Sequence, residues 1–141
     1  MDDVLTGVGK HEFELYFNCP PGRLQTDGGQ AGAYIYTGKR VRVSLVPLLT
    51  EGLAARVLEG SEDPIGGWVS YGYAIKVPAP QLIYGKSGEV PTRFLTAILQ
   101  EGTGASVQIE SEGVSEVRLV AECGGKRWEV TLGLAGCTIA A

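Results

Sequence analysis

The sequence predicts an all-β protein, an antiparallel β-sandwich of about ten short strands. Three observations lead to this class. Glycine supplies 21 of the 141 residues without a collagen period, which indicates many turns. Apolar and polar residues alternate over short segments, as in strands with one buried face. Turn residues separate these segments at regular intervals, and such spacing is typical of a sandwich.

Length and composition favour one globular domain spanning residues 1–141. Hydrophobic residues make up 44% of the chain and charged residues 20%, which is an ordinary globular balance. The net charge of −4 argues against nucleic acid as a partner, because phosphate contacts need a basic face. The best basic cluster, residues 39–42, is interpreted as a solvated strand face. No apolar run has the length of a membrane span, and residues 1–3 lack the basic start of a signal peptide.

The N-terminal part predicts a strand, a loop and a hairpin. Residues 1–9 are polar and are expected to be a loose entry. Residues 10–18 alternate well and predict a strand with one apolar face, made by Phe13, Leu15 and Phe17. Residues 23–32 are expected to be a mobile, glycine-rich loop.

The hairpin is expected to pair residues 33–36 with residues 39–46 about Thr37-Gly38, and to end at Pro47. Val41, Val43 and Leu45 should face the interior. Residues 51–59 have some helical spacing but are interpreted as a strand, since only about two turns of helix would fit there. Residues 60–67 are expected to form a loop.

The central stretch, residues 66–99, is expected to organise the fold. Its longest apolar run, Phe94–Leu99, suits a strand covered on both faces. Residues 84–88 are interpreted as the turn that joins it to the preceding buried strand. Residues 68–76 are aromatic and extended, and the prolines that follow exclude a helix.

The C-terminal part predicts three alternating strands and an edge strand. The three are centred on residues 107–110, 116–122 and 128–132, and Gly124-Gly125 should join the last two in a tight hairpin. Residues 134–141 are expected to add the edge strand.

Residues able to hold a metal or a cofactor are sparse in this sequence. Cys19, Cys123 and Cys137 have no paired spacing, so no metal site is expected. Buried free thiols are favoured, with a Cys123–Cys137 bridge as the alternative. His11 is the sole histidine and is interpreted as a packed, hydrogen-bonded strand residue rather than a base. No phosphate-binding or dinucleotide motif is complete, so no cofactor is predicted.

A spaced pattern runs through the central stretch. Its residues are Gly67, Trp68, Ser70, Tyr73, Lys76, Pro78, Ala79, Pro80, Leu82, Tyr84, Val90, Pro91, Phe94 and Thr96. Upstream, residues 10–17 lead to Pro21-Gly22. The two segments together resemble the heparinase II/III family of polysaccharide lyases, in which a strand and a Pro-Gly turn open the late β-region. The resemblance covers roughly residues 8–100.

The resemblance implies that the chain is the non-catalytic C-terminal β-sandwich of such a lyase. Its partners would be upstream catalytic domains of the same polypeptide and an acidic polysaccharide containing uronic acid. The parent would act by β-elimination and would be periplasmic or secreted. In this family the catalytic histidines and tyrosine lie outside this region, so the resemblance implies no catalytic residue here and no activity for the isolated chain.

Three aromatic residues, Trp68, Tyr71 and Tyr73, are the candidates for glycan contact. Aromatic faces stack on sugar rings, and alternate strand positions such as 71 and 73 would form a platform. The favoured interpretation is that these residues pack within the sandwich. A stand-alone carbohydrate-binding module and a protein-interaction module are the alternatives to the support role, and the sequence does not select a glycan.

Overall fold

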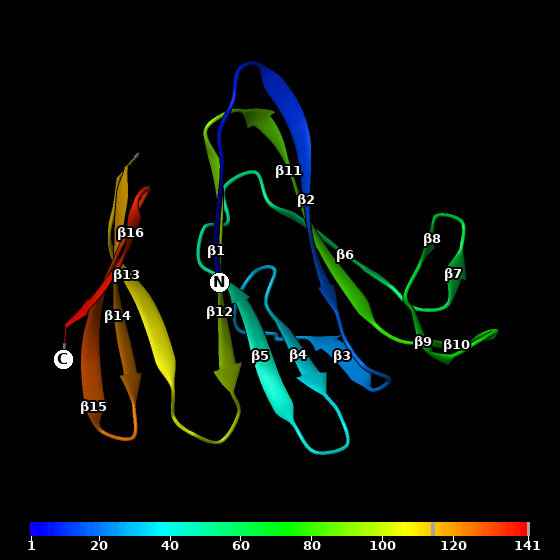
Figure 1. The fold of residues 1–141 in the computed structure, drawn as a ribbon. Coiled ribbons are helices and arrows are strands. Elements are labelled where there is room, and N and C mark those ends of the chain that lie inside the picture. Colours follow the sequence, from blue (N-terminus) through cyan, green and yellow to red (C-terminus); the bar gives the residue numbers. More distant parts are fainter. Residues whose placement is uncertain (114, 141) are drawn as a thin grey trace.

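The computed structural model describes residues 1–113 and 115–140 (Figure 1). These residues form sixteen strands and no helix, and every strand pairing is antiparallel, which confirms the predicted all-β class. Strands are more numerous than expected because residues 2–5 and 23–26 add strands to a main sheet, and residues 61–78 form two small hairpins. The strands are β1 (Asp2–Leu5), β2 (Lys10–Asn18), β3 (Arg23–Thr26), β4 (Tyr34–Thr37), β5 (Arg42–Pro47), β6 (Ala54–Leu58), β7 (Ser61–Glu62), β8 (Ile65–Gly66), β9 (Trp68–Gly72), β10 (Ile75–Pro78), β11 (Gln81–Glu89), β12 (Thr92–Gln100), β13 (Ser106–Glu112), β14 (Glu116–Cys123), β15 (Lys126–Gly133) and β16 (Gly136–Ala140).

Three sheets form the body of the molecule. A five-stranded sheet has the order β1-β12-β5-β4-β3 and is called the central sheet below. The three-stranded sheet β2-β11-β6 packs on one of its faces, and the four-stranded sheet β13-β14-β15-β16 packs on the other (Figure 1). Two small hairpins, β7-β8 and β9-β10, lie to one side of this body, at the right in Figure 1.

Two hydrophobic cores lie on opposite faces of the central sheet. The buried members of the first core are Leu45, Leu82, Tyr84 and Phe94. The buried members of the second core are Leu95, Val117 and Leu119. Since Phe94 and Leu95 are neighbours on β12, their side chains point to opposite faces of the sheet. The predicted strand with two covered faces is therefore confirmed over Phe94–Ala97, whereas Ile98 is 51% exposed.

The prediction of a loose N-terminus is wrong. Residues 2–5 form β1, which pairs with β12 in the central sheet. The N-terminal ammonium donates to the carbonyl oxygen of Thr96 at 2.9 Å. The Nε and Nη2 groups of Arg93 each donate to one carboxylate oxygen of Asp2 at 2.6 Å. A bidentate pair with side chains only 22% and 10% exposed holds the strand in place, because such geometry is among the stronger polar contacts.

The turn predicted at residues 84–88 is also wrong. Strand β11 runs unbroken from Gln81 to Glu89 and pairs with β2 along its whole length. The chain reverses after it, at residues 90–91, and β12 then enters a different sheet. Gly85 and Gly88 are strand residues here, because the pairing of β11 with β2 on one side satisfies the backbone through this segment.

Three smaller predictions need correction. Part of the loop predicted at residues 23–32 is strand β3, which pairs with β4. The loop predicted at residues 60–67 contains the short hairpin β7-β8. Val41 is 45% exposed because it lies in the turn between β4 and β5, while Leu45 is buried as expected. The strand expected at residues 10–18 is present as β2, and the strand expected at residues 51–59 is present over Ala54–Leu58 as β6. The strands centred on residues 107–110, 116–122 and 128–132 are β13, β14 and β15. The edge strand expected at residues 134–141 is β16 over Gly136–Ala140, and residue 141 lies outside the described residues.

Candidate functional site

The two small hairpins form a projecting unit, which we call the arm (residues 61–78). Trp68 begins β9, is half-buried, and its indole Nε1 donates to the carbonyl oxygen of Ser61 at 2.9 Å. The Lys76 ammonium lies 3.9 Å from the centroid of the Trp68 ring and also pairs with Glu62 at 3.0 Å. The arm is therefore built around Trp68, whose ring joins β9, β10 and β7.

The sequence predicted that Tyr71 and Tyr73 occupy alternate positions of one strand, and this prediction is wrong. Strand β9 ends at Gly72, and Tyr73 and Ala74 form the turn into β10. Tyr73 is 100% exposed and Tyr71 is 67% exposed. Ala74 has a φ of +56°, a left-handed conformation that costs a residue with a Cβ some strain. The structure thus presents both tyrosines to solvent, but one from a strand and the other from a turn.

The arm carries further apolar surface. Ile65 is 74% exposed and Ile75 is 56% exposed, and both belong to the arm with the two tyrosines. Apolar side chains gathered in one exposed unit are a common mark of a contact surface. The three candidate residues are therefore brought together in one element, but only Tyr71 and Tyr73 have free side chains.

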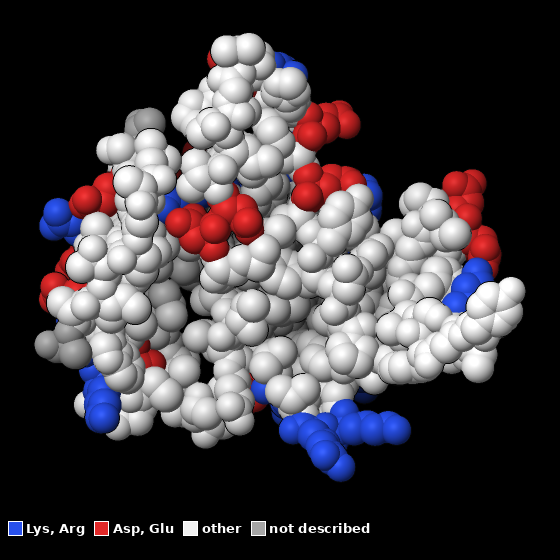
Figure 2. Space-filling view, viewed as in Figure 1, with Lys and Arg blue, Asp and Glu red and all other residues white. Residues whose placement is uncertain are grey.

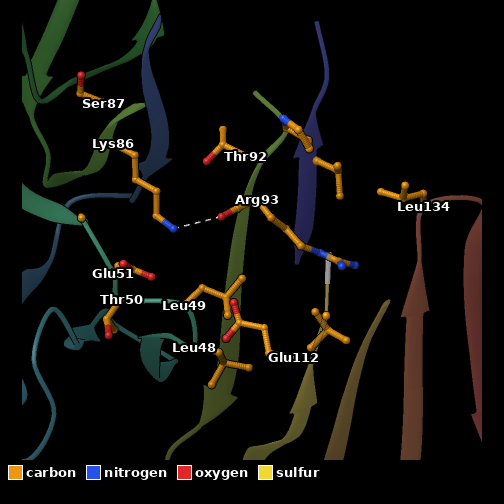
Figure 3. Close-up of a pocket in the computed structure, with 15 residues that line it drawn as sticks. Leu48, Leu49, Thr50, Glu51, Lys86, Ser87, Thr92, Arg93, Glu112 and Leu134 are labelled. Carbon is orange, nitrogen blue, oxygen red and sulfur yellow. Dashed lines mark hydrogen bonds between the residues drawn. The ribbon is translucent and has the colours of Figure 1, made fainter. Parts of the chain in front are cut away.

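A second feature is a cavity of about 630 Å³, which we call the interlayer cleft. It opens where the β5–β6 loop, the ends of β11 and β12, and the end of β13 meet (Figure 3). Its polar lining includes Thr50, Glu51, Lys86, Ser87, Thr92 and Glu112. The volume lies in the range of small-molecule sites, and the lining is suited to a hydrophilic occupant.

Lys86 is the charged centre of the cleft. Its ammonium donates to the carbonyl oxygen of Arg93 at 3.1 Å, and it lies 5.5 Å from the centroid of the Phe94 ring. Figure 3 shows the Glu51 and Glu112 carboxylates directed toward it from two sides. Burial lowers the pKa of the Lys86 ammonium, and the Glu112 and Glu51 charges act in the opposite direction.

Sequence reasoning missed the cleft for three reasons. Lys86 shares the inward face of β11 with Leu82 and Tyr84. A charged residue on an apolar strand face indicates a functional site, but the sequence analysis placed a turn at residues 84–88 and so did not recognise it. Glu112 follows an irregularity in the β13–β14 register, which no local pattern predicts. The loop that carries Glu51 meets the other two residues only through the packing of the three sheets.

Other chemistry-bearing residues lie apart from both features. His11 is exposed rather than packed, and its Nε2 is within 2.9 Å of the carbonyl oxygen of Val8. Cys19, Cys123 and Cys137 are free thiols, but the prediction that they are buried is wrong, since Cys19 and Cys123 are only partly buried and Cys137 is exposed. Partial burial raises the pKa of the Cys19 thiol. Among the described residues, no three His, Cys, Asp or Glu side chains gather at metal-binding distance. None of the described segments is a helix long and apolar enough to cross a membrane.

Charge is distributed unevenly on the face drawn in Figure 2. Acidic side chains gather at the boundary between the β13–β16 sheet and the rest of the body, and basic side chains gather at the lower edge, by the β4–β5 turn.

Comparison with family models, characterised proteins and solved structures returns no match to this chain. The arm and the interlayer cleft are therefore the features of this chain that bear on its function.

Proposed function

We propose that this chain is the non-catalytic C-terminal β-sandwich of a heparinase II/III-like polysaccharide lyase. Its role is to pack against upstream catalytic domains of the same polypeptide and to form one wall of the cleft that holds a uronic-acid glycan. The resemblance of residues 8–100 to that family supplies the identity of the partner. The three-layered body supplies a rigid support.

The observation that carries the support role is the exposed apolar surface of the arm. Four of its side chains, Ile65, Tyr71, Tyr73 and Ile75, are more than half exposed. Aromatic and branched aliphatic side chains of this kind are those that interfaces enrich, and their burial against another domain would be favourable. The arm is thus the surface by which this module contacts the catalytic domains.

A stand-alone carbohydrate-binding module is the second candidate, and the exposure of Tyr71 and Tyr73 favours it. Their rings are free to stack on sugars. Trp68 supports it less, because one ring face is covered by Lys76 and the indole N–H is already bonded to Ser61. A protein-interaction module without glycan contact would use the same exposed arm.

An immunoblot of the native host, with an antibody against this chain, tests the support role. We expect a polypeptide much heavier than the 14.9 kDa of this chain. A band at 14.9 kDa alone would overturn the proposal, because no catalytic domain would then share the polypeptide.

Calorimetric titration of the isolated chain with heparan-type and alginate oligosaccharides distinguishes the carbohydrate-binding module from the support role. The carbohydrate-binding module predicts heat that disappears in a Tyr71→Ala/Tyr73→Ala variant. The support role predicts that these two substitutions leave any glycan binding unchanged. A Tyr16→Ala variant is the matched control, since Tyr16 is also exposed but lies on β2, outside the arm.

A further inference from the structure

The interlayer cleft contains a lysine at a position that the fold would normally fill with an apolar residue. Leu82, Tyr84 and Lys86 alternate along β11 and face the central sheet, and the first two are 0% exposed. A half-buried ammonium loses hydration, so its N–H groups need acceptors. Lys86 has three N–H donors, and within the described residues one acceptor is recorded, the carbonyl oxygen of Arg93.

A β-bulge directs Glu112 into the same cleft. Ile109 of β13 lies opposite Leu119, on the inward face of the β13–β16 sheet. The register shifts between Ile109 and Ser111, so that Glu112 lies opposite Val117, which also faces inward. Without the extra residue, strict alternation would turn Glu112 outward. Bulges of this kind recur beside binding sites because they re-aim a side chain.

The charges of the cleft determine which ligand it suits. The charge of the Arg93 guanidinium is compensated by Asp2, which Nε and Nη2 contact, while its buried Nη1 has no partner among the described residues. The uncompensated charges of the cleft are therefore one ammonium, from Lys86, and two carboxylates, from Glu51 and Glu112. Neither carboxylate forms a salt bridge with Lys86, although both influence its pKa. The remaining balance is negative, so an anionic ligand is disfavoured.

We propose that the interlayer cleft binds one uncharged sugar ring. Sugar hydroxyls would donate to the Glu51 and Glu112 carboxylates and accept from the Lys86 ammonium, and the hydroxyl of Thr92 would complete the contacts. Leu49 and Leu48 offer an apolar wall for the C–H face of the ring. This site lies outside the arm and does not depend on the chain belonging to a lyase.

Amide chemical shifts of the labelled chain, titrated with methyl glycosides of glucose, galactose and mannose, test this site. We expect at least one glycoside to bind with a dissociation constant of about 1 mM or weaker, as one ring with a few hydrogen bonds allows. The shifts should map to residues 49–52, 86–93 and 111–113. Glucuronate, the anionic counterpart, should bind more weakly than the methyl glucoside.

Two variants and a matched control identify the groups responsible. Glu112→Gln and Lys86→Met should each weaken binding roughly tenfold, because each removes a charge-assisted hydrogen bond. Glu110→Gln makes the same charge change on β13, but Glu110 lines a separate pocket. The Glu110→Gln variant should therefore bind the sugar with the same affinity as the unaltered chain. Unchanged dispersion of the spectrum shows that each variant is folded.

The opposing outcomes are distinct. Shifts confined to the arm, or equal loss of binding in Glu110→Gln, would overturn the assignment of the cleft. Glucuronate binding more tightly than the glucoside would overturn the charge argument. No shift with any of the three glycosides would overturn the site altogether, while leaving the support role to be decided by the immunoblot.

Discussion

Tyr84 and Tyr73 are the same residue type, eleven positions apart, and lie in opposite environments. Tyr84 is 0% exposed, and its hydroxyl donates to the carbonyl oxygen of Gly32 at 2.7 Å. Tyr73 is 100% exposed in the turn of the arm. The body surrounds the first ring on all sides, whereas the arm leaves the second ring to water or to a partner.

Packing in this molecule therefore depends on how many sheets surround a side chain rather than on aromatic content. Phe17 packs against Tyr84 from β2 with ring centroids 5.8 Å apart, and Phe94 and Leu45 meet it from the central sheet. The arm is a pair of two-stranded hairpins, and such hairpins have little stability of their own. Its order comes from Trp68 and from its junction with the body.

The largest expected effect of a single substitution comes from truncating Tyr84. Tyr84→Ala should lower the free energy of unfolding by about 3–5 kcal/mol, because it removes a fully buried ring and leaves a cavity between two sheets. Tyr73→Ala should change it by less than about 0.5 kcal/mol. Urea denaturation of both variants measures the difference. Similar losses in the two would mean that the arm is packed in solution.

The junction between arm and body gives the next effect. Gly67 has a φ of +72°, and a Cβ there would lie 2.5 Å from backbone atoms of Leu58 and Glu59. The Gly67 carbonyl oxygen also accepts from the backbone nitrogens of Gly60 and Ala79, at 2.8 Å and 2.9 Å. Gly67→Ala should cost about 2–4 kcal/mol, because strain and overpacking coincide.

Gly88→Ala is the control for that substitution. Gly88 lies on β11 with nothing within 4 Å of an added Cβ and no positive φ. We expect a change within about 0.5 kcal/mol. Limited proteolysis should show earlier cleavage between residues 60 and 78 in Gly67→Ala only. Equal resistance in both variants would show that the arm does not depend on this junction.

Local sequence patterns predicted the strands of the body that have regular side-chain alternation or a clear turn sequence. The alternation of Phe13, Leu15 and Phe17 identified β2, and the glycines at 124 and 125 identified the hairpin between β14 and β15. The Phe94–Leu99 run identified the strand between two layers. Each of these elements is specified by side-chain periodicity or turn chemistry within a few residues.

The remaining elements depend on contacts that are distant in sequence. Strand β1 is ordered by the Asp2–Arg93 pair, 91 residues apart. Glycines in 84–88 suggested a turn, yet pairing with β2 keeps β11 extended. Glu112 entered the cleft because of a bulge. The candidate tyrosines follow from their positions in one aromatic segment, whereas the cleft requires three sheets to be assembled first.

The hydroxyl of Tyr84 gives a smaller, pH-dependent effect. Tyr84→Phe should cost about 1–2 kcal/mol near neutral pH, because the Gly32 carbonyl loses its donor. Burial raises the pKa of Tyr84 above its ordinary value of 10.0, so the folded chain keeps a proton that the unfolded chain releases. The stability that this group contributes is fully present below pH 10 and is lost as pH rises further.

The free energies of unfolding of the unaltered chain and of Tyr84→Phe should therefore become more alike above pH 10. Above pH 10 the advantage of the unaltered chain over Tyr84→Phe should shrink by about 1.4 kcal/mol per pH unit. Urea denaturation at pH 7, 9, 10 and 11 follows this convergence, and tyrosinate absorbance reports the ionisation. A gap that is constant from pH 7 to 11 would contradict the burial of this hydroxyl.

The smallest effect is expected within the arm itself. Trp68→Phe removes the indole donor to Ser61 but keeps an aromatic face for the Lys76 ammonium, so it should cost about 1 kcal/mol or less. Because few contacts join the arm to the body, hydrogen exchange should accelerate at residues 61–78 and stay unchanged in β11 and β12. If protection fell equally in β11, arm and body would open as one unit, and the contrast between Tyr73 and Tyr84 would reflect exposure alone rather than separate stability.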